Sequence, residues 1–115
     1  MSNGTPTPPS QASVLNSLGT AAHAAFQAYQ AVQSANPGGD TSQLYMKWQT
    51  LSALYAQAAA KALTQDPAVA AAQSQLDAMT RTITAELKSI QNIASWVTIV
   101  DNLVQMATTV AKFFA

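Results

Sequence analysis

Cysteine is absent from this 115-residue chain, and histidine occurs once, at His23. The chain therefore forms no disulfide bond, builds no thiolate zinc site and has no thiol nucleophile. Because its carboxylates are dispersed along the sequence, His23 also lacks the companion ligands that a transition-metal site within one chain needs. We expect no bound metal and no cofactor.

Charged side chains are also scarce, because five basic and five acidic residues make up only 9% of the chain. Their charges cancel to a net charge of zero. An average soluble domain is roughly 25% charged. A nucleic-acid surface needs clustered Lys and Arg, because affinity comes from neutralising phosphates and releasing counterions. We expect no nucleic-acid partner, because the basic residues are scattered. They are Lys47, Lys61, Arg81, Lys88 and Lys112.

Signatures of catalysis are also missing. Gly38-Gly39 is not followed by the Lys-Ser or Lys-Thr of a phosphate-binding loop. A catalytic histidine needs an orienting partner, and the sequence indicates none for His23, which lies beside a core position of its helix. Asp77 and Glu86 are nine residues apart, which places them about 180° apart around a helix of 3.6 residues per turn. We predict that the protein is not an enzyme.

The first eleven residues lack the basic stretch and apolar run of a cleaved signal peptide. They hold three of the five prolines, and no aliphatic residue follows Met1. We predict a disordered tail over 1–11, either a recognition tail or a spacer, because chain ends are usually loosely held. Localisation stays open between the cytoplasm and export by a route without a cleaved leader.

Apolar residues recur at alternating steps of three and four through the rest of the chain, which is the spacing of amphipathic helices. Breaks at 36–40 and 65–67 divide the pattern, and the predicted helices span 12–35, 41–64, 67–92 and 95–115. The sequence thus predicts one all-α domain over 12–115, an antiparallel bundle of three or four helices joined by short loops. The residues expected in its core are Leu15, Leu18, Ala22, Ala25, Tyr29, Val32, Leu44, Trp48, Leu51, Tyr55, Ala58, Ala62, Val69, Ala72, Leu76, Met79, Ile83, Leu87 and Ile90.

Polar residues near the breaks fit helix ends. Asp40 followed by Gln43 resembles a capping box, in which each side chain satisfies a free amide of the first turn. Asp66 before Pro67 places an N-cap ahead of a proline at the first helical position. Lys61 is expected in the last turn of the second helix, where a positive charge meets the negative end of the helix dipole.

The segment 93–115 is apolar around most of its circumference. A helix of this kind is normally buried on several sides, so it passes through the middle of a bundle, faces a partner chain or meets a membrane. No glycine or proline separates it from the preceding helix. We place a turn at 92–95, and the alternative is one long helix from Pro67 onward. Its polar residues form one stripe, Ser95, Thr98, Asn102, Gln105, Thr109 and Lys112, with Asp101 and Thr108 beside it.

Several large side chains are candidates for an interface. Phe113-Phe114 directs two rings about 100° apart on one helix, and a monomer rarely exposes such groups together without a reason. A net charge near zero also favours association, although a monomeric bundle with a low-charge surface fits the same composition. The predicted interface residues are Tyr45, Trp96, Val97, Val100, Leu103, Val104, Val110, Phe113 and Phe114.

The stretch 36–55 resembles the central part of type III secretion needle subunits, in which a proline-containing turn joins two helices and an aromatic-Gln run with Leu-Ser follows, here Trp48-Gln49-Thr50-Leu51-Ser52. The stretch 39–48 is also similar to helical-hairpin substrates of the type VII route, which carry Trp-x-Gly at the turn where this chain has Asn-Pro-Gly. Both families are two-helix hairpins, and this chain has material for further helices. The resemblance implies only a class of leaderless, charge-poor helical proteins that are exported or polymerise.

The leading functional prediction is a non-enzymatic helical protein that packs against copies of itself or against another helical protein, in a bacterial secretion or filament setting. Removal of 95–115 should then abolish assembly. The alternative is a membrane-active protein that releases 95–115 into a bilayer, because the segment has about the 20 residues that span a membrane. Against this alternative, Asp101 near the middle of the segment costs about 2.5–3.5 kcal/mol on insertion scales.

Overall fold

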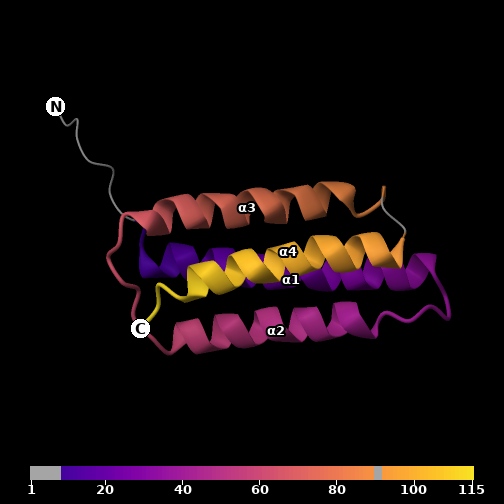
Figure 1. The fold of residues 1–115 in the computed structure, drawn as a ribbon, viewed down its shortest axis with the longest axis horizontal. Coiled ribbons are helices and arrows are strands. Elements are labelled where there is room, and N and C mark those ends of the chain that lie inside the picture. Colours follow the sequence, from indigo (N-terminus) through magenta and orange to yellow (C-terminus); the bar gives the residue numbers. More distant parts are fainter. Residues whose placement is uncertain (1–8, 90–91) are drawn as a thin grey trace.

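The computed structural model describes residues 9–89 and 92–115. Within these ranges the chain forms four helices, α1 (Gln11–Ala35), α2 (Ser42–Ala59), α3 (Ala68–Glu86) and α4 (Ile93–Ala111). Successive helices run in opposite directions, so the fold is an up-down-up-down bundle (Figure 1). The predicted all-α bundle is confirmed, with four helices.

The two central helices are α1 and α4, each of which packs against the other three helices. In the described ranges α2 and α3 do not contact each other, and they lie on opposite outer sides of the bundle (Figure 1). The small side chains of α1 let its neighbours approach closely, and its buried residues lie on more than one face. They are Val14, Ser17, Leu18, Ala21, Ala22, Ala24, Ala25, Ala28 and Val32.

Of the three environments expected for the last helix, the structure shows the middle of the bundle. The apolar side of α4 packs against the other helices, and Trp96 at its start is completely buried. The predicted polar stripe is its exposed side, because every one of its six residues is exposed. No helix in the described ranges is long and apolar enough to cross a bilayer.

Helices α3 and α4 are separate, so the alternative of one long helix from Pro67 is wrong. The third helix ends at Glu86, six residues before the predicted end at 92, and a turn follows it at 87–89. The turn predicted at 92–95 is therefore misplaced, and α4 spans Ile93–Ala111 instead of the predicted 95–115. The side chain of Asn92 caps α4 by accepting a hydrogen bond from the Ser95 N–H at 3.1 Å. The predicted core residue Ile90 lies outside the described residues.

The start of α1 corrects the boundary of the predicted tail. Gln11 is the first residue of the helix, and Ser10 caps it by accepting a hydrogen bond from the Ser13 N–H. The predicted tail 1–11 therefore overlaps the helix at its last residue, and residues 1–8 lie outside the described ranges.

The predicted capping box at the start of α2 is wrong. The Asp40 carboxylate accepts hydrogen bonds from the N–H and hydroxyl of Ser42, and Thr41 is the N-cap residue. At the next junction the Asp66 carboxylate does accept the Ala68 N–H, so the capping interaction exists although the helix begins one residue after Pro67.

The second helix ends earlier than predicted because its continuation is paired with other parts of the chain. Ala62 exchanges two backbone hydrogen bonds with Ala115, and the Thr64 N–H donates to the Phe113 carbonyl at 2.7 Å. Leu63 and Phe114, both buried, form an isolated antiparallel bridge between these segments. We call the paired segments 61–64 and 113–115 the clasp.

The side chain of Gln11 completes the clasp. Its amide donates to the Lys61 carbonyl at 3.1 Å and accepts the Leu63 N–H at 3.2 Å. Lys61 consequently lies beyond α2 and not in its last turn, as the sequence had indicated. The start of α1, the α2–α3 connection and the end of α4 are thereby joined at one end of the bundle (Figure 1).

Candidate binding surface

Four aromatic rings lie in mutual contact on one side of the α1–α2 pair. The ring centroids of Phe26 and Trp48 are 4.9 Å apart, those of Tyr45 and Trp48 5.4 Å, those of Tyr29 and Tyr45 5.5 Å, and those of Phe26 and Tyr29 6.0 Å. These separations fall in the range of favourable aromatic pairs, and each pair is tilted. We call these four residues the aromatic face.

Helical spacing and the α1–α2 turn place the rings together. Phe26 and Tyr29 are three residues apart on α1, as Tyr45 and Trp48 are on α2, so each pair shares one side of its helix. The turn between the helices reverses the chain with Gly38 at a φ of 84°, a conformation that favours glycine. The two pairs therefore meet along the halves of α1 and α2 that are nearer the turn.

The aromatic face is open to solvent at its α2 edge. Tyr45 is 39% exposed, and the other exposed large hydrophobic residues of the described chain, Met46 at 62% and Tyr55 at 41%, are also on α2. A methyl group added at Gly19 would lie 3.4 Å from the ring of Tyr55, which shows that this ring covers α1 farther along the same pair of helices. Exposed apolar groups gathered in this way mark binding surfaces more often than isolated ones do.

The sequence predicted Tyr29, Trp48 and Tyr55 in the core, and the structure confirms this in part. Tyr29 and Trp48 are half-buried and pack against the core, whereas Tyr55 is exposed. The buried residues of α2 are Leu44, Leu51 and Ala58, and the predicted core residue Ala62 is also exposed.

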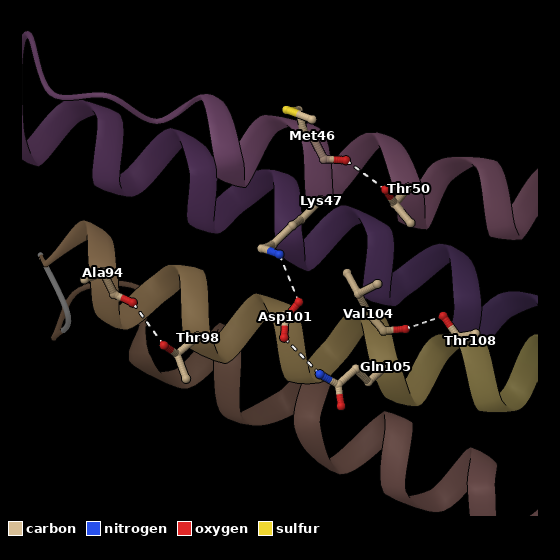
Figure 2. A network of polar contacts seen from close by, with 9 residues as sticks. All are labelled: Met46, Lys47, Thr50, Ala94, Thr98, Asp101, Val104, Gln105 and Thr108. Atoms are coloured by element: carbon tan, nitrogen blue, oxygen red, sulfur yellow. Dashed lines mark hydrogen bonds and ion pairs between the residues drawn. The ribbon is translucent and has the colours of Figure 1, made fainter.

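No charged side chain belongs to the aromatic face. Helix α1 has no Asp, Glu, Lys or Arg, and α2 has Lys47 alone. The ammonium of Lys47 is directed toward α4, where it lies 2.9 Å from the Asp101 carboxylate (Figure 2). Hydrogen bonds from Lys47 and then Gln105 hold the pKa of Asp101 below its ordinary value. The one cation of the two helices is thus already paired.

Hydrogen-bond donors of the aromatic face remain available. Among the described residues, the indole N–H of Trp48 and the hydroxyl of Tyr45 have no hydrogen-bond partner. In the same part of the chain no buried side-chain nitrogen or oxygen lacks a partner, so the indole nitrogen of half-buried Trp48 reaches solvent. Tyr29 differs, because its hydroxyl accepts a hydrogen bond from Gln33 at 3.3 Å.

The predicted interface residues are divided between the surface and the core. Tyr45 is exposed and belongs to the aromatic face. Val97, Val104 and Phe113 are half-buried. Buried in the core of the single chain are Trp96, Val100, Leu103, Val110 and Phe114. A partner would reach these five only if α4 and the clasp left the bundle.

Sequence reasoning did not single out Phe26 for the site. The sequence does contain a signal for Phe26. It is three residues before Tyr29 and seven after Gly19, so the three positions lie on one side of the helix and form a second apolar line on α1. This line was hidden because the neighbouring line through Ala22, Ala25 and Val32 satisfies the same helical spacing.

A second surface feature is a polar groove of about 290 Å³ between α1 and α3. The Gln73 amide bridges the two helices by donating to the hydroxyls of Ser13 at 2.9 Å and Ser17 at 3.1 Å. Asp77 and Arg81 also line the groove, and within the described residues they form no ion pair with each other. The described residues also contain no group of three metal-ligating side chains.

The candidate site of the described chain is therefore an uncharged aromatic surface with free donors. Such a surface suits the recognition of another macromolecule, because Tyr and Trp combine a large apolar area with a hydrogen-bonding group. Comparisons of the chain with protein-family models, with curated proteins and with solved structures found no match.

Proposed function

We propose that the protein is a non-enzymatic binding protein that associates with copies of itself, or with another helical protein, through the aromatic face. The observation that carries the proposal is the set of four contacting rings, with Tyr45 exposed and no charged side chain among them. Tyr and Trp are enriched where interfaces gain most of their binding energy, and charged residues are depleted at interface centres.

The position of α4 favours this surface over the last helix as the site of association. The apolar side of α4 is packed inside the bundle, and its outer side is the polar stripe. Removal of 95–115 would take Trp96 and Leu103 out of the core, so loss of assembly in that truncation would report unfolding as readily as a lost interface. A test on the α1–α2 surface avoids this ambiguity.

A bacterial secretion or filament setting belongs to the same proposal. Its support is the resemblance of 36–55 to exported helical hairpins, since this stretch contains the α1–α2 turn and the two α2 residues of the aromatic face, Tyr45 and Trp48. The low charge adds support, because uncharged surfaces of two copies do not repel each other.

The test is size-exclusion chromatography with light scattering over a wide range of protein concentration. We expect the wild-type chain to form species larger than its 12.0 kDa monomer as concentration rises. The double variant Tyr45→Lys, Tyr55→Lys should stay monomeric, because both positions are exposed and burying the new ammonium groups against a second apolar surface would cost their hydration. The matched control is Ala78→Lys, Ala85→Lys, which places the same charges on exposed positions of α3.

Two results would overturn parts of the proposal. A wild-type monomer at every concentration removes self-association and leaves only a different helical partner. Equal association of the Tyr45→Lys, Tyr55→Lys variant and the α3 control removes the aromatic face as the contact surface. Circular dichroism melting of both variants verifies that the comparison is made between folded proteins.

A further inference from the structure

We propose that the aromatic face binds the proline-containing segment Thr5-Pro6-Thr7-Pro8-Pro9 of a second copy of this chain. The inference rests on the proposed function and names the occupant of its surface. It joins the aromatic face, in which Tyr45 is exposed and the other three rings are half-buried, to the proline-rich stretch that precedes α1 in the sequence.

The chemistry of the segment complements that of the aromatic face. Three of its five residues are prolines, which have no N–H, so the segment offers mainly carbonyl acceptors. Proline also restricts the backbone toward the polyproline II conformation, which has no internal hydrogen bonds and loses little freedom on binding. The aromatic face offers the opposite set, namely ring surfaces and the unpartnered donors of Trp48 and Tyr45.

Aromatic-lined surfaces are a recurrent way of binding such segments. Flat rings pack against proline rings, and an indole N–H or a phenol hydroxyl donates to a carbonyl of the segment. Neither the segment nor the aromatic face carries a charged side chain, so no ion is stripped of water on binding.

Distances along the chain assign the segment to a second copy. From Gln11 at the start of α1 to Phe26 is about 22 Å along the helix at 1.5 Å per residue, and Tyr29 lies farther. Pro6 is five residues before Gln11, so even a fully extended chain carries it at most about 17 Å from that point. The prolines of a chain therefore do not reach across its own four rings.

The proposed contact joins unlike surfaces, because the segment precedes one end of α1 and the aromatic face lies toward the α1–α2 turn at the other end (Figure 1). Each copy then has one segment to give and one surface to receive. Such association closes into a reciprocal dimer or a ring where the rotation between copies allows it, and otherwise forms open chains.

The experiment is a fluorescence titration of the full-length chain, kept dilute, with a synthetic peptide of residues 1–11. The peptide has no aromatic residue, so the signal comes from the protein, where Trp48 lies in the aromatic face and Trp96 is buried. We expect a saturable change with the native peptide. The peptide with alanine at Pro6, Pro8 and Pro9 should bind about tenfold more weakly or not at all, a loss of at least roughly 1.4 kcal/mol.

Variants of the full chain test the same contact by light scattering. Pro6→Ala, Pro8→Ala should lower the association of the chain, and the matched control Ser2→Ala, Asn3→Ala should not. Tyr45→Ala serves as the receptor variant because Tyr45 is exposed and its loss leaves the core intact. It should abolish peptide binding while keeping a cooperative melt.

The outcomes separate this inference from the proposed function. If the proline variant associates like wild type while Tyr45→Lys, Tyr55→Lys does not, the aromatic face is an interface with a different occupant and the proline inference is overturned. If neither variant changes association, both proposals fail. Equal binding of the native and alanine peptides also overturns the inference, because it would show that proline is not recognised.

Discussion

Two glycines of the chain, Gly19 and Gly38, differ in whether their backbone conformation tolerates a side chain. Gly38 in the α1–α2 turn has a φ of 84°, where a Cβ strains the backbone although nothing lies within 4 Å of its position. Gly19 is inside α1 with a negative φ, and a Cβ added there would have the exposed ring of Tyr55 as its nearest neighbour, at 3.4 Å. Glycine in a helix interior costs about 0.8–1.0 kcal/mol relative to alanine.

Substitution of the two glycines should therefore change stability in opposite directions. We expect Gly19→Ala to raise the free energy of unfolding by about 0.5–1 kcal/mol, because the helix gains and Tyr55 moves aside. Gly38→Ala should lower it by about 1–2 kcal/mol through left-handed strain. Urea unfolding followed by circular dichroism measures both, and a destabilised Gly19→Ala would show that the Tyr55 ring is firmly held against α1.

The clasp explains which helix ends could be predicted from the sequence and which could not. The seams of α1 to α3 and the solvent stripe of α4 follow from local spacing, and the structure confirms most of these positions. The end of α2 was predicted five residues too late, because residues 60–64 have no local signal that stops a helix. Their backbone groups are taken by Gln11 and by residues 113–115, about fifty positions away.

The aromatic face shows a different limit of sequence reasoning. Trp48 and Tyr55 fit the core spacing of their helix, yet α2 is an outer helix that buries only one narrow line of residues. Spacing identifies lines of apolar residues on a helix, and it does not say how many neighbours the helix will have. That number was set by α1 and α4 taking the centre, which is a property of the assembled bundle.

The clasp predicts unequal roles for its two phenylalanines. Phe114 is buried against the bundle and Phe113 is half-buried. We expect Phe114→Ala to lower the free energy of unfolding by about 3–5 kcal/mol, the usual cost of emptying a buried aromatic site. Phe113→Ala should cost less than half of that, and equal losses in chemical denaturation would contradict the placement of Phe114 in the core.

The ion pair between α2 and α4 predicts a pH dependence. The pKa of Asp101 is lowered in the folded chain, chiefly by the hydrogen bond from Lys47, so its contribution is present above the unfolded aspartate value of about 3.9. The contribution disappears as pH falls through the lowered folded value. Wild type should therefore be more stable than Asp101→Asn at pH 7.

The difference in free energy of unfolding between wild type and Asp101→Asn should shrink as the pH is lowered below about 4. Comparing the two proteins removes the effect of Asp40, whose pKa is also lowered, by its hydrogen bonds from Ser42, and which is present in both. Urea midpoints at neutral and acid pH provide the measurement. A constant difference across this range would show that the charge of Asp101 does not stabilise the fold.

At the scale of the whole molecule, the central place of α4 separates two ways of assembling. In one, copies meet through the outer α1–α2 surface and every bundle stays closed. In the other, α4 leaves its bundle and packs against another chain, exposing Trp96 and its neighbours during the exchange. The second way requires opening a core in which Trp96, Val100 and Leu103 are fully buried, so it is slow and costly.

The two tryptophans distinguish these routes, because Trp48 reaches solvent at the aromatic face and Trp96 is buried. We expect acrylamide to quench one part of the wild-type fluorescence readily and to leave the other part protected, at dilute and at associating concentrations alike. The variant Trp48→Phe, which keeps a ring in the face, assigns the protected part to Trp96. If Trp96 became accessible as assemblies form, α4 would be exchanging between chains, and the interface predicted along 95–115 would replace the aromatic face. Continued protection of Trp96 means that assembly leaves the four-helix core intact and uses its outer surface.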